Sequence, residues 1–215
     1  MGKLLNRRRY MGGVIDDTIH EIEWLQNSGT QYILTDIVEA MGTGDYWEMT
    51  AIVENASVSI IFMGSKSANN AKNYGFFRTA TNYWGFYRNN YSGDVQGVVQ
   101  KTNTGTYYMK LATNSRPTYT LKLNGSNVSS NNTAQTAITP DYSLAFFGRN
   151  IEGVVTASKG SFKFVSARFV KSDSTVKVDI VPVRKGRVGY LYDKISNKIY
   201  GNNGTGSFTL GPDKT

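Results

Sequence analysis

From residue 22 onward the chain consists of short runs in which apolar and polar side chains alternate, separated by clusters rich in glycine, asparagine and serine. The run YTLKL at residues 119–123, for example, places its apolar side chains on one face, because successive side chains of a strand point to opposite sides. No run follows the roughly 3.6-residue period of a helix for any length. Short strands at this spacing are typical of an all-β sandwich or barrel.

We expect strands at residues 22–26, 31–38, 46–54, 57–64, 75–81, 83–88, 95–100, 106–112, 118–124, 143–148, 161–171, 176–184, 188–193 and 198–201. Phe162 and Phe164 share one strand face, and a β-bulge is needed to return Phe169 to that face. Residues 124–139 are polar and of low complexity, so we expect an exposed loop there.

The length of 215 residues fits a single β-sandwich domain. We place this domain at residues 22–215, after an N-terminal arm and connector at residues 1–21. The chain has no cysteine, which excludes disulfides, thiolate metal sites and a cysteine nucleophile. No window approaches the roughly 20 apolar residues of a membrane span, and the N-terminus does not read as a secretory signal, so we expect no membrane partner.

Positive charge is concentrated in the arm. The chain has a net charge of +8, and half of it comes from Lys3, Arg7, Arg8 and Arg9, with no acidic residue in the first 13 positions. The rest of the chain therefore lacks the clustered Lys and Arg of a nucleic-acid-binding face, and we expect no direct nucleic-acid partner. The arm is long enough for about two helical turns, although so short a helix is marginal in isolation.

The C-terminal third carries the most specific pattern, VDIVPVRKGRVGYLYDKISNKIYGNNGTGSFTLGP at residues 178–212. It resembles the end of concanavalin-A-like (laminin-G-like) jelly rolls found in proteins of gut bacteria and their phages. Residues 22–26 and 29–33 resemble the first strand pair of the same family. The resemblance implies an antiparallel jelly-roll sandwich of two sheets, in which the first and last strands are neighbours. The matching C-terminal residues are Val181, Pro182, Val183, Arg184, Gly189, Tyr190, Tyr192, Asp193, Tyr200, Asn202, Gly204, Thr205, Gly206, Ser207, Phe208 and Gly211.

Local chemistry agrees with that layout. Asp193 and Asn197 suit a turn between two strands, because their side chains bond nearby backbone groups. The glycines at 201, 204, 206 and 211 allow close backbone packing at the closing edge of the sandwich.

The arm MGKLLNRRRYMGG resembles the opening of virion proteins of tailed phages that infect gut bacteria. This second resemblance implies a phage structural protein, made in the bacterial cytoplasm and located in the virion, where it would form part of a head fibre or capsid decoration. Its partners would be capsid or fibre subunits and further copies of itself in a homo-oligomer. The anchoring residues would be Leu4, Leu5, Arg7, Arg8, Arg9 and Tyr10, with Met11 beside them. The alternative is a tail that merely increases solubility.

We expect no enzymatic activity and no cofactor or metal. Glycoside hydrolases that retain configuration need two carboxyl groups roughly 5–5.5 Å apart. The nearest candidates, Glu48 and Glu54, share a strand face but lie about 20 Å apart along an extended backbone. The single histidine, His20, falls in the connector, and no cluster of His and Asp has the spacing of a zinc site.

Aromatic residues gather between positions 74 and 91, interleaved with two arginines. Sugars stack on exposed aromatic rings, so Tyr83, Trp84, Tyr87 and Tyr91 are candidates for stacking against surface glycans. The alternative is that alternate members of this cluster fill the core. A second function therefore stands beside the virion role: a lectin-like carbohydrate-binding module, including a tail protein that binds host glycans.

Overall fold

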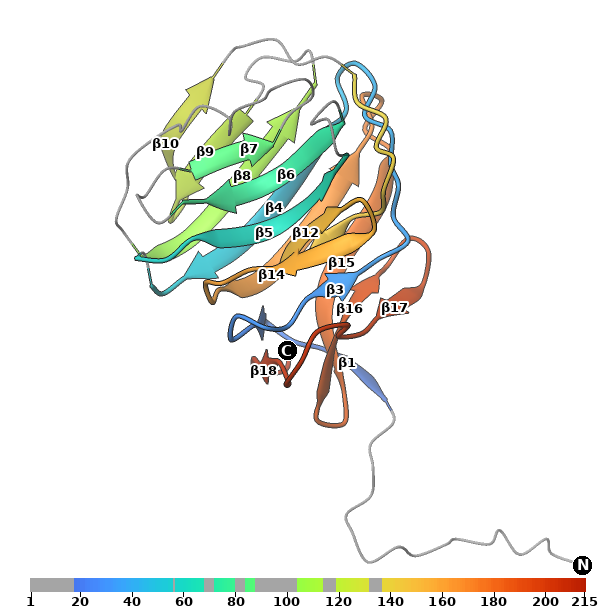
Figure 1. The fold of residues 1–215 in the computed structure, drawn as a ribbon. Helices are drawn as coiled ribbons and strands as arrows, with labels where there is room; N and C mark the ends of the chain where they lie inside the picture. The colour runs from blue at the N-terminus through green and yellow to red at the C-terminus, as the bar shows by residue number, and fades with distance from the viewer. Residues whose placement is uncertain are drawn as a thin grey trace, which may run out of the picture.

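The computed structural model describes residues 18–55, 57–67, 72–79, 84–87, 104–113, 119–131 and 137–215, without the side chains of residues 85–87, 119 and 128–131. These residues form two β-sheets packed face to face, as the alternation predicts, with no helix among them (Figure 1). Accordingly, the described part of the chain holds no helix long and apolar enough to cross a membrane.

Among the described residues, the larger sheet has eleven strands, and its main path runs β10-β9-β8-β4-β14-β15-β16-β17. Beside this path, β1 pairs with β15, and β2 pairs with β14 and β18. The bounds are β1 Ile19–Glu21, β2 Leu25–Gln26, β4 Tyr46–Val53, β8 Gly105–Ala112, β9 Tyr119–Leu123, β10 Ser126–Asn131, β14 Lys163–Val170, β15 Val176–Lys185, β16 Val188–Asp193, β17 Lys198–Tyr200 and β18 Thr209–Leu210.

The described part of the smaller sheet has seven strands, ordered β13-β12-β5-β11-β3, with β6 pairing β5 and β7. Its pairs are antiparallel except for β12 with β5, which is parallel. The bounds are β3 Ile33–Leu34, β5 Ile60–Lys66, β6 Asn73–Arg78, β7 Trp84–Tyr87, β11 Ala145–Phe146, β12 Gly148–Ile151 and β13 Val154–Ala157.

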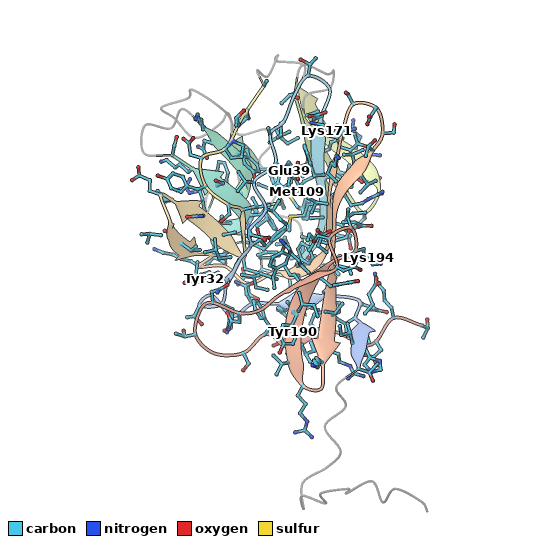
Figure 2. The ribbon with its side chains drawn as sticks, turned by 90° about the vertical axis from the view of Figure 1, so that its right-hand side faces the viewer. Tyr32, Glu39, Met109, Lys171, Tyr190 and Lys194 are labelled. Carbon is cyan, nitrogen blue, oxygen red and sulfur yellow. The ribbon has the colours of Figure 1, made fainter. Side chains whose placement is uncertain are left out.

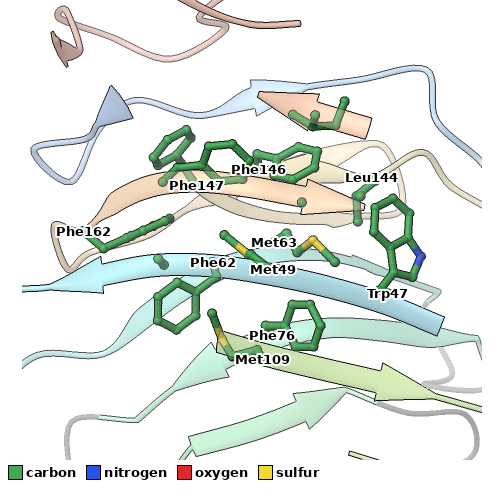
Figure 3. Packing of buried hydrophobic residues seen from close by; sticks show 14 of the residues in the cluster. Trp47, Met49, Phe62, Met63, Phe76, Met109, Leu144, Phe146, Phe147 and Phe162 are labelled. Carbon is green, nitrogen blue, oxygen red and sulfur yellow. The ribbon is translucent and has the colours of Figure 1, made fainter. Parts of the chain in front are cut away.

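The core lies between the two sheets and is rich in aromatic rings (Figure 3). Strand β4 shows how the pattern produces it, because every second residue from Trp47 to Val53 is buried while the residues between them are half-buried. Trp47 lies at one end of the cluster beside Leu144, and Phe162 lies at the opposite end. The predicted bulge is confirmed: β14 shifts register against β4 between Phe164 and Ser166, and Phe169 is buried.

The predicted loop at residues 124–139 is wrong over its first half. Residues Ser126–Asn131 form β10, which pairs with β9 across a two-residue turn. Asn124 and Gly125 make this turn with φ angles of 47° and 81°, the conformation that Asn-Gly favours in hairpins. A second hairpin that we did not predict joins β12 to β13 through Glu152 and Gly153, with φ angles of 53° and 88°.

Other predicted strands differ mainly in length. The runs at 22–26 and 31–38 contain only β2 and β3, each two residues long, and the run at 95–100 lies outside the described residues. Strand β1 begins at Ile19, three residues before the predicted start of the domain, and pairs with β15. His20 is therefore a strand residue opposite Arg184.

The two ends of the described chain meet, as the jelly-roll resemblance implies. Strand β18 pairs with β2, and Ile22 forms a bridge with Asp213. The hairpin at Asp193 is confirmed, since its carboxylate accepts hydrogen bonds from the turn that leads to β17. Glu21 adds ion pairs to Lys194 at 2.7 Å and to Lys214 at 2.5 Å.

The anchoring residues between Leu4 and Met11 lie outside the described residues, so the virion attachment, its location and the homo-oligomer stay predictions. The role of the arm in attachment can be tested separately from folding with two truncated chains. A chain that starts at Val14 keeps β1 and the ion pairs of Glu21, and we expect its melting temperature to stay within a few degrees. A chain that starts at Ile22 loses both, and we expect a fall of roughly 4 °C or more, on the scale of about 2–4 °C per kcal/mol.

Calorimetry measures both changes, and co-sedimentation with intact particles measures attachment. Equal destabilisation by the two deletions would place the arm within the folded domain. Normal attachment of the chain that starts at Val14 would mean that the arm only increases solubility.

Candidate functional site

The structure removes one of the four aromatic residues proposed to stack on sugars. Trp84 is only 1% exposed, with its ring 5.4 Å from Phe62 and 4.1 Å from Tyr107 between centroids. It fills the core, and a sugar in solution has no access to it. Tyr87 lies in β7 without a described side chain, whereas Tyr83 and Tyr91 lie outside the described residues.

The two carboxylates considered for hydrolysis belong to separate polar contacts on the outer face of the larger sheet. Glu48 accepts a hydrogen bond of 2.8 Å from the Tyr108 hydroxyl and lies 3.6 Å from the Arg168 guanidinium. Glu54 instead forms an ion pair with Lys163. Another cross-strand contact lies on the same face, where the Lys110 ammonium is 3.6 Å from the centre of the Tyr46 ring. These side chains therefore interact with one another across neighbouring strands.

A hollow of about 260 Å³ offers a different environment. It lies between the segment that follows β3, the start of β15 and the hairpin of β16 and β17. Residues 36–39 and residues between 177 and 200, which are far apart in the sequence, therefore share its wall. Its lining residues are Asp36, Ile37, Val38, Glu39, Lys177, Val178, Asp193, Ser196, Lys198 and Tyr200.

Hydrogen bonds to the chain before β11 fix the segment after β3. The Thr35 hydroxyl and backbone N–H both donate to the Leu144 carbonyl, at 2.7 and 3.0 Å. The Leu144 N–H in turn donates to the Ile37 carbonyl at 2.9 Å. Because Ile37 is buried in the core, its neighbours Asp36 and Val38 face outward. The segment is thus extended and fixed at the edge of the hollow.

Asp193 belongs to the framework of the hollow. Its side chain is almost fully buried, and its carboxylate accepts hydrogen bonds from the Asp179 N–H at 2.9 Å, the Ile195 N–H at 3.1 Å and the Ser196 hydroxyl at 2.6 Å. These hydrogen bonds occupy both acceptor oxygens of the carboxylate and hold the hairpin turn in place.

Asp36 and Tyr200 form the rim. The Tyr200 hydroxyl donates to Asp36 at 2.7 Å, and the Lys198 ammonium pairs with the same carboxylate. These hydrogen bonds, that of Lys198 foremost, lower the pKa of Asp36 below its usual range. Burial and the bond to Asp36 raise the pKa of the Tyr200 hydroxyl, which therefore stays protonated. Asp36 and Lys198 thus form an ion pair with each other at the rim.

Glu39 is the unpaired acid of this region. Nothing in the described chain hydrogen-bonds to its carboxylate or pairs with it. Burial raises its pKa, with smaller contributions from Asp193 and Asp45, against the lowering effect of Lys171 and Lys177. Figure 2 shows Glu39 between Lys171 and Lys194 along the height of the molecule.

The two lysines near Glu39 differ in whether they form an ion pair. Lys171 pairs with Asp45, a buried carboxylate that also accepts from the Gly42 N–H at 2.6 Å and the Ser172 N–H at 2.9 Å. Lys177 lines the hollow and is exposed. The hollow therefore presents one carboxylate and one ammonium that are not paired with each other. Such a pair of groups can bind a ligand that both donates and accepts hydrogen bonds.

Sequence reasoning did not find Glu39, because no motif surrounds it and the residues that share its hollow lie far away in the chain. A perturbed pKa in a concave site marks a candidate functional residue, but it depends on the folded structure. The described residues contain no group of three or more His, Cys, Asp or Glu side chains placed to bind a metal ion.

Comparison with known proteins gives a structural likeness only. No protein-family model and no curated protein sequence match this chain. The chain is similar to a crystal structure from Bacteroides ovatus provisionally described as a carbohydrate binding protein, with a TM-score of 0.59 and 11% identity over 91% of this chain and 61% of that one. It is also similar to the CBM40 module of the Ruminococcus gnavus IT-sialidase, with a TM-score of 0.44 and 13% identity over 69% of this chain and 91% of that one.

The same module bound to α2,6 sialyllactose gives a TM-score of 0.41 and 15% identity, over 69% of this chain and 92% of that one. This chain spans about 61% of the length of the Bacteroides ovatus protein. At such low identity, that likeness establishes the β-sandwich fold and no ligand.

Proposed function

We propose that this protein is a carbohydrate-binding module that holds one sugar residue in the hollow between Glu39 and Lys177, without hydrolysing it. The observation that carries the proposal is Glu39, a half-buried carboxylate without a partner in a concave site. An uncompensated, partly buried charge costs free energy, so a ligand that donates hydrogen bonds to it recovers that cost.

Sugar hydroxyls match these two groups better than most ligands do. Each hydroxyl both donates and accepts, so neighbouring hydroxyls can donate to the Glu39 carboxylate and accept from the Lys177 ammonium. Val38 and the Tyr200 ring supply apolar surface for the C–H groups of a sugar ring. The volume of about 260 Å³ falls just below the roughly 300–1,000 Å³ of drug-sized pockets, which favours a single ring over a longer chain.

The fold supports the same class of function. The Bacteroides ovatus neighbour is provisionally described as carbohydrate-binding, and it shares the sandwich over 91% of this chain. This agreement concerns the scaffold, whereas the proposed site rests on the side chains of the hollow.

Glycan-array screening, followed by calorimetric titration of the glycans that bind, tests the proposal. We expect Glu39→Ala and Lys177→Ala each to weaken binding roughly ten- to a hundredfold, because a hydrogen bond to a charged group contributes about 1.5–3 kcal/mol. Glu23→Ala and Lys159→Ala are matched controls, since both residues are exposed and lie outside the lining of the hollow.

Loss of binding must occur without loss of the fold. Burial raises the pKa of Glu39 in the folded state, so its negative charge disfavours folding at neutral pH. Glu39→Ala should therefore keep or slightly raise the melting temperature. Absence of any glycan ligand, or unchanged binding by both hollow variants, would overturn the proposal.

A further inference from the structure

The charges around the hollow also bear on which sugars it accepts. Its lining holds three carboxylates, those of Asp36, Glu39 and Asp193, against two lysines, Lys177 and Lys198. Lys198 is committed to Asp36 at the rim. Lys171, which lies near Glu39, is committed to the buried Asp45. Among the described residues that line the hollow, Lys177 is the one lysine without an ion pair.

The described lining of the hollow also lacks the residue that is over-represented where proteins bind carboxylates. Arginine is the common solution, because its planar guanidinium donates two parallel hydrogen bonds to a carboxylate. No arginine belongs to the described lining of the hollow. A ligand carboxylate placed beside Lys177 would also face the negative charges of Glu39 and Asp193. Like charges at short distance in a partly buried site repel strongly.

We infer that the hollow selects sugars that carry a free amine over neutral sugars, and rejects sugars that carry a carboxylate. This inference rests on the proposed function and refines its ligand class. A hexosamine ammonium would give Glu39 the cationic partner it lacks, while the ring hydroxyls would still reach Lys177. The raised pKa of Glu39 supports this assignment, since Lys171 and Lys177 offset the effect of burial on this carboxylate only in part.

The test compares matched ligands on the full chain near neutral pH. The probes are the methyl glycosides of glucosamine, glucose and glucuronic acid, together with the corresponding galacto series, which differ in charge on the same ring. We expect the amine-bearing sugar of the series that binds to be roughly tenfold tighter than the neutral one, the effect of about 1.4 kcal/mol. The acidic sugar should bind at least roughly tenfold more weakly than the neutral one.

Glu39→Gln should remove the preference, so that the amine-bearing and neutral sugars bind this variant with equal affinity, because the amide still accepts a hydrogen bond but carries no charge. Glu23→Gln is the control and should leave the preference unchanged. For the wild type, the preference should decline as acid protonates Glu39, whose charged neighbours are Lys171, Lys177, Asp193 and Asp45.

The outcomes separate this inference from the proposed function. Binding of neutral sugars with no gain from the amine, or tighter binding of the acidic sugar, would overturn the inference alone. An amine preference that survives in Glu39→Gln would also overturn it. Failure of every probe and of the glycan array would overturn the proposed function, and the inference with it.

Discussion

Replacing Trp47 with alanine is expected to lower the melting temperature by roughly 6–20 °C. Removing a buried tryptophan side chain costs about 3–5 kcal/mol, and a domain of this size loses about 2–4 °C per kcal/mol. Trp47 belongs to β4 of the larger sheet, with its ring 6.3 Å from Tyr74 of the smaller sheet and 5.2 Å from Phe169 of β14 between centroids. Its loss would leave a cavity between the sheets.

A second substitution separates packing from polarity. The indole N–H of Trp47 is buried, and no described residue accepts a hydrogen bond from it. Trp47→Phe removes this unsatisfied donor while keeping much of the ring, so we expect less than half the loss seen with alanine. Differential scanning calorimetry measures both, with Val154→Ala at an exposed position as the control. A fall of less than about 3 °C for Trp47→Ala would contradict its place in the core.

The sequence pattern predicted which strand faces are buried, and it did so best where the strands are long. Alternation placed Phe162 and Phe164 on one face, which is buried, and the odd spacing of five residues between Phe164 and Phe169 predicted the bulge in β14. It failed at Asn124 and Gly125, where polar composition hid a hairpin that the Asn-Gly pair itself favours. Composition describes solvent exposure, whereas the turn depends on two residues that tolerate positive φ angles.

The candidate site was less predictable for a physical reason. A strand pattern reports which face a side chain occupies but not which distant segment lies beside it. Glu39 and Lys177 share a hollow because the segment after β3 is tied to Leu144 and runs past the β16–β17 hairpin. The aromatic cluster had the opposite problem, since residues such as Trp84 could fill the core or face solvent with the same spacing.

Asp45 and Glu39 illustrate what the fold adds to composition. Burial raises the pKa of Asp45, but hydrogen bonds from Lys171, Ser172 and Gly42 outweigh it and hold that pKa below its usual range. Asp45 therefore stabilises the folded state above its unfolded pKa, and this contribution is lost as the pH falls through the lower folded value. Glu39, nearby, has burial without such partners, so its pKa rises. The first carboxylate serves structure, and the second is left available for a ligand.

Gly204→Ala is the second large effect that we expect, with a fall in melting temperature of roughly 2–12 °C. A Cβ at this position would lie 2.2 Å from the Thr30 carbonyl oxygen and 3.0 Å from the Gln31 Cα and the Tyr32 nitrogen, all backbone atoms that cannot rotate away. Overpacking of this kind costs about 1–3 kcal/mol, on the scale of about 2–4 °C per kcal/mol.

The clash would fall on contacts that close the sandwich. The Thr205 N–H donates to the same Thr30 carbonyl at 3.3 Å, and the Asn203 N–H donates to the Tyr32 carbonyl at 2.9 Å. Displacing Gly204 weakens both bonds, because the two donors flank it. Gly201→Ala is the matched control, since its Cβ would lie 3.6 Å from the Tyr190 ring in ordinary contact. Calorimetry of the two variants decides the point, and equal melting temperatures would mean that the segment around Gly204 is not packed against residues 30–32.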